Sequence, residues 1–131
     1  GRKLLTLVSD LMHLGEDIPK VKEDADIYQV LREISKKRLG VTLVIGEQDQ
    51  LLGIITDGDL RRLIEKRKDI SQTHAKDMMA SHPKTITKDT LAAKAVRIMQ
   101  DNSITSLVVV SENQKVEGII HLHDILKAGV V

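Results

Sequence analysis

A phrase that occurs twice constrains the fold of this chain more than any other feature. The segment GIITDGDLRR begins at Gly53, and GIIHLHDILK begins at Gly118, 65 residues later. From Asp24 and Asp89 onward the two halves align at this offset without a gap, although only 8 of the 43 aligned positions are identical. Because one such unit leaves a face of its sheet uncovered, we expect the two copies to complete a shared core.

The order of patterns in the first half predicts its secondary structure. An apolar period over 4–13 indicates a helix, and IPKV at 18–21 a short extended segment. A second helix is expected from an N-cap at Asp24 to a stop at Gly40. Its apolar stripe consists of Ile27, Val30, Leu31 and Ile34. Strands at 41–46 and 51–56 flank the polar EQDQ and precede a helix over 57–68.

The second half repeats these patterns in the same order. They fall at 75–80, 82–86, 89–102, 106–111, 115–121 and 122–129. We therefore expect an α+β fold of two β-α-β-β-α repeats packed about a pseudo-twofold axis. The first repeat, with an N-terminal linker helix, is expected over 1–70 and the second over 71–131.

Composition argues against several classes of function. The net charge of the 131 residues is +1, and Tyr28 is the only aromatic residue, which disfavours nucleic acid as a partner. Without cysteine there are no disulfides, catalytic thiolates or Cys-ligated metals. No apolar run is long enough to span a membrane, and no signal-peptide pattern is present. We expect a cytoplasmic protein without a membrane partner, and the start at Gly1 suggests a piece of a longer chain.

The junction from Thr56 to Asp59 has two interpretations. The T-x-x-D spacing fits a capping box, in which the hydroxyl accepts a helix N–H and the carboxylate reaches back to the backbone. The same free N–H groups, hydroxyl and flexible Gly58 also suit a phosphate, and the carboxylate could accept the hydroxyls of a ribose. The first copy alone does not choose between them.

The second copy changes one partner and keeps the other. His121 replaces Thr56, whereas Asp124 matches Asp59. If a histidine cannot cap as threonine does, Asp124 has lost its capping partner, and a polyol or nucleotide ligand explains it better. We then expect two binding sites that are not equivalent.

Other polar residues near these junctions are weaker candidates. Arg61 and Arg62 fall near a helix start, where the dipole disfavours cations, so either an anionic partner or plain solvation is expected. Thr105 and Ser106 line the site or simply begin a strand. His121 and His123 are interpreted as donors to phosphate or carboxylate, as metal ligands with Asp124, or as ordinary polar residues.

The duplicated pattern with GIITDGD resembles a tandem pair of CBS domains, also called a Bateman module, over the whole chain. In that family the Thr and Asp of G-x-x-T-x-x-D commonly hold the phosphate and ribose of adenine nucleotides. The resemblance implies these roles for Thr56 and Asp59. In the second copy only Asp124 matches, with His121 or His123 as replacements for the threonine.

Several segments of the sequence resemble a narrower group of proteins within this family. RKLL, MHLGEDIPKV, TDGDLRR and HLHDILKAGVV resemble the C-terminal region of bacterial D-arabinose-5-phosphate isomerases, in which a sugar-isomerase (SIS) domain precedes a CBS pair. No stretch resembles the SIS domain, so we expect a regulatory part without catalytic residues or a required cofactor. The resemblance implies isomerisation of D-ribulose 5-phosphate and D-arabinose 5-phosphate for Kdo and lipopolysaccharide synthesis.

The same resemblance implies partners and ligands. AMP, ADP or ATP follows from the general behaviour of CBS pairs, and CMP-Kdo from feedback by an end product. Homo-oligomerisation through the CBS pair and an attached SIS domain are also implied. The alternative is a ligand-free module that only assembles the same enzyme.

Overall fold

The computed structural model describes residues 2–66 and 69–131. The chain divides into two compact units. The repeat-1 unit contains residues 16–83, and the repeat-2 unit contains residues up to 15 together with 84–131. The N-terminal segment therefore packs with most of the second repeat, while residues 71–83, the beginning of the expected second repeat, pack with the first. Two sheets and five helices within the described residues confirm the α+β class.

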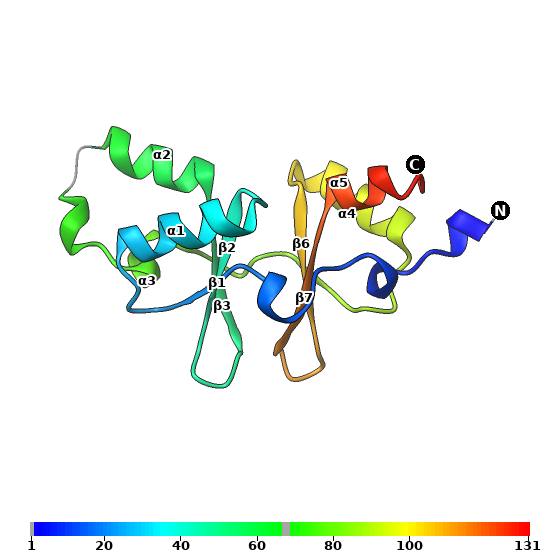
Figure 1. Ribbon diagram of the computed structural model, residues 1–131, viewed down its shortest axis with the longest axis horizontal. Helices are drawn as coiled ribbons and strands as arrows, with labels where there is room; N and C mark the ends of the chain where they lie inside the picture. Colours follow the sequence, from blue (N-terminus) through cyan, green and yellow to red (C-terminus); the bar gives the residue numbers. More distant parts are fainter. Residues whose placement is uncertain (1, 67–68) are drawn as a thin grey trace. The chain divides into compact units, whose positions relative to one another are not determined.

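The repeat-1 unit is a four-stranded sheet covered by helices (Figure 1). Its strands lie in the order β1 (Lys20–Lys22), β2 (Val41–Ile45), β3 (Leu51–Thr56) and β4 (Ala80–Ser81). β1 is parallel to β2, and the other pairs are antiparallel. The helices are α1 (Ile27–Lys37), α2 (Asp57–Glu65) and α3 (Ala75–Met78). Val30 and Ile34 of α1 and Leu60 of α2 pack with Val44 and Ile55 of the strands in one core.

The repeat-2 unit has the same plan. Its sheet has the order β5 (Thr85–Ile86), β6 (Ser106–Val110) and β7 (Val116–His121), and its helices are α4 (Ala92–Asn102) and α5 (Leu122–Lys127). The backbone of His13 extends this sheet, since its N–H donates to Ile119 (2.8 Å) and its carbonyl accepts from Ile119 (3.2 Å). His13 thus lies where β4 lies in the repeat-1 unit.

Close packing of backbones explains the repeated glycine. A Cβ atom on Gly118 would lie 2.8 Å from the carbonyl oxygen of His13 and 2.9 Å from Sδ of Met12. A Cβ on Gly53 would lie 2.9 Å from the carbonyl oxygen of Ala80 and 2.5 Å from a methionine sulfur. Both glycines are buried within strands, so the position is glycine because another segment crosses there, and not because the chain turns.

The structure corrects four details predicted from sequence. Residues 4–13 do not form one helix: short 3-10 turns at Arg2–Leu5 and Val8–Asp10 alternate with backbone pairing, because this segment is drawn into the repeat-2 unit. Asp26, not Asp24, caps α1 and forms a capping box with Gln29. Leu31 is 40% exposed and is not part of the core. The helix ends at Lys37, before the predicted stop.

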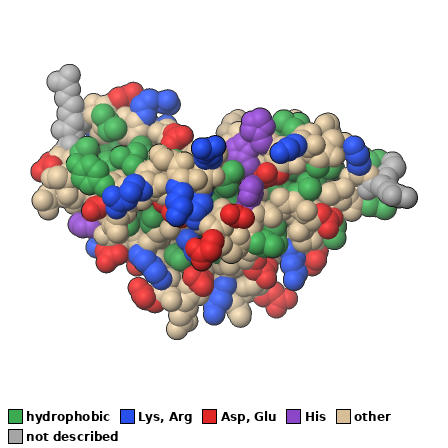
Figure 2. All heavy atoms as spheres, in the orientation of Figure 1, with side chains coloured by type: hydrophobic (Ala, Val, Ile, Leu, Met, Phe, Trp, Pro, Cys, Tyr) green, Lys and Arg blue, Asp and Glu red, His purple; other side chains and the backbone are tan. Residues whose placement is uncertain are grey.

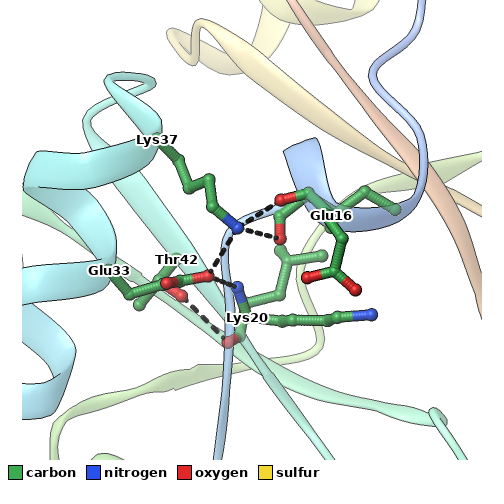
Figure 3. A network of polar contacts seen from close by, with 7 residues as sticks. Glu16, Lys20, Glu33, Lys37 and Thr42 are labelled. Carbon is green, nitrogen blue, oxygen red and sulfur yellow. Dashed lines mark hydrogen bonds and ion pairs between the residues drawn. The ribbon is translucent and has the colours of Figure 1, made fainter.

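A polar network holds the segment that enters β1 against α1 (Figure 3). The ammonium group of Lys37 lies 3.1 Å from Oε2 of Glu33 and donates to the backbone carbonyls of Glu16 and Ile18. The same Glu33 oxygen accepts the N–H of Lys20 at 2.9 Å. Because the Lys37 and Glu33 side chains are only 14% and 19% exposed, this pair is shielded from solvent.

We expect Gly118→Ala to destabilise the repeat-2 unit by about 1–3 kcal/mol, because the added methyl group meets a backbone carbonyl that cannot move freely. Urea unfolding measures the change. Gly46→Ala is the control, since the three atoms nearest to a Cβ there all belong to the side chain of Gln50, which can rotate away. Equal losses in the two variants would contradict the explanation for the repeated glycine.

A second variant tests the network at β1. We expect Lys37→Met to lower the free energy of unfolding by about 1–3 kcal/mol, because Glu33 and two backbone carbonyls lose a donor. Glu47→Gln removes a 3.9 Å pair with Lys22 in which Glu47 is 92% exposed, and should change stability by less than about 0.5 kcal/mol. Urea unfolding curves give both values. An unchanged free energy of unfolding in Lys37→Met would show that the network does not stabilise the fold.

Candidate functional site

The junction between β3 and α2 forms a complete capping box. Oγ1 of Thr56 accepts the N–H of Asp59 at 3.1 Å, and Oδ2 of Asp59 accepts the N–H of Thr56 at 2.9 Å. The other carboxylate oxygen of Asp59 accepts a hydrogen bond from Nη2 of Arg62 at 2.7 Å. A carboxylate offers about four lone-pair positions, so Asp59 can still accept hydrogen bonds from a ligand. Thr56 and Asp59 therefore form the capping box that the T-x-x-D spacing predicts, and this arrangement does not exclude a ligand at the same residues.

Three donor groups surround Gly58 at the start of α2. From the position of an added Cβ, Nη1 of Arg62 is 3.3 Å away and Oγ1 of Thr56 is 3.6 Å away. The N–H of Gly58 has no hydrogen-bond partner among the described residues of the repeat-1 unit. A helix N–H, a hydroxyl and a guanidinium that meet over a residue without a side chain form a suitable surface for a phosphate.

The two arginines of α2 differ in their surroundings. Arg62 lies in the last turn of the helix and forms an ion pair with Asp59. The anionic partner expected for an arginine of this helix is therefore a residue of the helix itself. Arg61 is exposed and forms no ion pair with the described residues of its unit. Arg62 therefore belongs to the junction, whereas nothing in the geometry connects Arg61 to it.

The junction between β7 and α5 uses a histidine as its cap. Nδ1 of His121 accepts the N–H of His123 at 3.0 Å, and Oδ2 of Asp124 accepts the N–H of His121 at 2.8 Å. The expectation that His121 cannot cap is wrong, because the imidazole reaches the second N–H of the helix instead of the third. Asp124 keeps its capping role, so its presence alone does not require a ligand.

A residue that the sequence argument missed completes this junction. Nε2 of His13 lies 3.0 Å from both carboxylate oxygens of Asp124. His13 belongs to the N-terminal segment, which lies outside the ungapped 65-residue alignment, and it occupies the position that Ala80 of β4 has in the repeat-1 unit. Asp59 is thus held by an arginine of its own helix, and Asp124 by a histidine from a distant part of the chain.

Burial and hydrogen bonding fix the state of His121. Burial lowers its pKa, and His123 and His13 lower it further, against the opposing effect of Asp124. A neutral ring whose Nδ1 accepts a backbone N–H carries its proton on Nε2. The rings of His121 and His123 stack with centroids 5.5 Å apart. The junction thus offers a neutral donor at His121 instead of a fixed positive charge.

Ser106 and Thr105 occupy the entrance of β6. Ser106 is paired with His121 across the strands, and its buried Oγ has no hydrogen-bond partner among the described residues. The equivalent position beside Thr56 is Val41. Thr105 is exposed, and its carbonyl accepts the N–H of Leu122 at 2.8 Å. Since an unpartnered buried hydroxyl costs about 1–3 kcal/mol, Ser106 is a polar position that a ligand could satisfy.

The described residues contain no group of three or more His, Asp or Glu arranged to hold a metal ion. In the same part of the chain, every helix is too short or too polar to span a bilayer.

Comparison with protein families accounts for the two repeats. The model of the CBS domain matches residues 8–66 and again residues 75–131. The chain belongs to the CBS domain family. The CBS pair is 43% identical over all 131 residues to the arabinose 5-phosphate isomerase KdsD of Pseudomonas aeruginosa, and 40% identical to that of Escherichia coli K12. It spans 40% of the length of each of these relatives.

Solved structures confirm the fold of the CBS pair. The structure of CBSX2 in complex with AMP superposes with a TM-score of 0.81 at 23% identity, covering 95% of this chain and 96% of the other. The CBS domain pair of MJ0100, in complex with 5′-methylthioadenosine and S-adenosyl-L-methionine, gives a TM-score of 0.85 at 20% identity with the same coverage. At these identities the likeness establishes the fold.

The lowered pKa of His121 predicts a pH dependence of stability. Unfolded His121 binds a proton more readily than folded His121, so stability should be complete above about pH 6.5 and fall at lower pH. We expect His121→Asn, which keeps a capping side chain, to show a smaller loss between about pH 7.5 and 5.5 than the unmodified chain. Urea unfolding at the two pH values measures this.

The exposed His82 of the repeat-1 unit offers a matched control. His82→Asn should leave the pH dependence close to that of the unmodified chain. If His121→Asn and the unmodified chain lose the same stability on acidification, His121 does not contribute in the proposed way.

Proposed function

We propose that this CBS pair is the nucleotide-binding regulatory module of a D-arabinose-5-phosphate isomerase. Its ligand is an adenine nucleotide or CMP-Kdo, the activated end product of the pathway that the isomerase supplies. The match along the whole chain to arabinose 5-phosphate isomerases carries the assignment to this enzyme. The attached SIS domain of the parent protein, which interconverts ribulose 5-phosphate and arabinose 5-phosphate, would respond to the bound ligand.

The repeat-1 junction supports phosphate binding. Thr56, Gly58 and Arg62 bring a hydroxyl, a backbone N–H and a guanidinium to one place, and Asp59 can accept ribose hydroxyls. In the CBSX2 and MJ0100 structures the molecules bound to the related folds are AMP and adenosine derivatives.

The repeat-2 junction supports a different contact. The N–H of His123 is already bonded to His121, so the helix start offers less to a phosphate than it does at Gly58. This junction provides hydrogen-bond acceptors and donors that suit a ribose or a sugar acid, from Asp124, His121, His123, Ser106 and Thr105. We infer that the repeat-1 junction binds a phosphate group and that the repeat-2 junction binds a less charged group.

Regulation needs only a modest difference in binding. A micromolar ligand contributes about 8 kcal/mol of binding free energy. A coupling of about 1–3 kcal/mol between ligand and catalytic domain would change isomerase behaviour about 5- to 150-fold. No cofactor is required for such a module.

A second candidate is an assembly module that works without a ligand. Tyr28, Leu31 and Ile64 on α1 and α2 are 61%, 40% and 55% exposed, and apolar side chains on neighbouring helices favour association with another copy. This candidate predicts concentration-dependent self-association with no response to nucleotides.

Thermal unfolding with AMP, ATP or CMP-Kdo separates the two candidates. At about 100 times its Kd, a true ligand adds roughly 2.7 kcal/mol of stability. We expect Asp59→Asn and Asp124→Asn to reduce this increment, each compared with its own ligand-free baseline. Asp77→Asn is the control, because Asp77 caps α3 in the same manner but belongs to neither junction.

The outcomes are distinct. If none of the three nucleotides changes the melting curve, and sedimentation shows self-association that Ile64→Ser abolishes, the assembly candidate replaces the regulatory one. If Asp77→Asn loses as much of the ligand increment as Asp59→Asn, the ligand does not bind at the proposed junction.

A further inference from the structure

An open groove lies outside the two strand–helix junctions, between the outer edge of β1 and helix α1 in the repeat-1 unit. Its volume is about 460 Å³. None of the residues that line it belongs to the proposed nucleotide site. The charged residues of the lining are Lys20, Lys22, Asp24, Arg32, Glu33 and Lys36.

The positive charges of this groove are not balanced by its acids. Glu33 is already paired with Lys37, a residue outside the lining, at 3.1 Å (Figure 3). Lys22 turns toward the carbonyl of Gly46, to which its ammonium group donates at 3.1 Å. Lys20, Arg32 and Lys36 form no ion pair with the described residues of their unit, and Figure 2 shows Lys and Arg side chains gathered over α1.

Protection of an edge strand explains only part of this charge. Lysines on a short edge strand such as β1 discourage pairing with another chain, which accounts for Lys20 and Lys22. Arg32 and Lys36 lie four residues apart on α1, where like charges repel each other and destabilise the helix slightly. The helix dipole favours a cation at Lys36, in the last turn of α1, but it does not account for Arg32 in the middle of the helix.

The second repeat serves as an internal control. At the offset of 65 residues, Lys20, Lys22 and Lys36 correspond to Thr85, Thr87 and Asp101. Arg32 is retained as Arg97, and Lys94 replaces Gln29. The positions that line the groove carry four cations and two acids in the first repeat, whereas the equivalent positions of the second repeat carry two cations and two acids. Because both repeats build the same sheet and helix, the additional cations of the first repeat are not a requirement of the fold.

We propose that the groove between β1 and α1 binds a small anionic metabolite through Lys20, Arg32 and Lys36. The anionic group is a phosphate monoester or a carboxylate. The guanidinium of Arg32 can form a bidentate pair with either group, while the two ammonium groups supply point charges. This second anion site belongs to the first repeat alone and is separate from the nucleotide junctions.

Amide chemical shifts of the full 131-residue chain, recorded at low salt, test the proposal with two probes, ribose 5-phosphate and citrate. We expect at least one probe to shift the amides of Lys20–Lys22 and α1 in a saturable manner, with a Kd on the order of 1 mM. A response to ribose 5-phosphate alone identifies a phosphate site, a response to citrate alone a carboxylate site, and a response to both a general anion site.

Matched variants give the decisive comparison. The combined change Lys20→Gln, Arg32→Gln and Lys36→Gln should weaken binding at least about tenfold. Lys94→Gln with Arg97→Gln, on the equivalent face of α4, should leave the Kd unchanged. The triple variant should also keep the stabilisation by AMP, ATP or CMP-Kdo, which separates this site from the nucleotide site.

Three results would overturn the proposal: no saturable shift with either probe, an unchanged Kd in the triple variant, or equal weakening in the control.

Discussion

The close approach of a second backbone to Gly53 and Gly118 is the contact on which the rest of the structure depends. A side chain at either position would collide with a backbone carbonyl of the crossing segment. With glycine, β4 at the beginning of the expected second repeat can complete the sheet of the first, and the N-terminal segment can complete the sheet of the second. The repeat-1 unit is thus one continuous stretch that closes only at residues 80–81, whereas the repeat-2 unit requires an N-terminal segment that is distant in sequence.

This exchange also sets the chemistry of the candidate site. Both repeats place an aspartate at the third position of a helix and bond it to the backbone N–H of the capping residue. The second partner differs: Arg62 comes from the same helix, whereas His13 arrives with the exchanged N-terminal segment. One junction therefore carries a permanent positive charge and the other an imidazole, so the electrostatic surroundings of the two aspartates differ.

Some elements were predictable because their signals are local. The two hairpins, the apolar period of α1 and the helix after GIIT depend on alternation, spacing and turn residues within a few positions, and they occur where expected. The prediction of a helix over 4–13 was wrong because the same apolar spacing also suits an irregular segment that packs across a sheet. Only the strand that the segment meets decides between a helix and such a segment. Leu31 fits the stripe of α1 by spacing, yet it lies on the side of the helix that the core does not reach.

By itself, the sequence determined that the chain is a duplicated α+β unit, that each copy ends a strand at a helix with an aspartate, and which family it resembles. These conclusions depend on short-range periodicity and on the comparison of one half with the other. Only the tertiary structure decided that His13 meets Asp124 and that His121 caps its helix. It also decided that three cations without an ion pair among the described residues of their unit share a groove beside β1. Such contacts join residues up to 111 positions apart or depend on the direction of single side chains, which local sequence patterns do not encode.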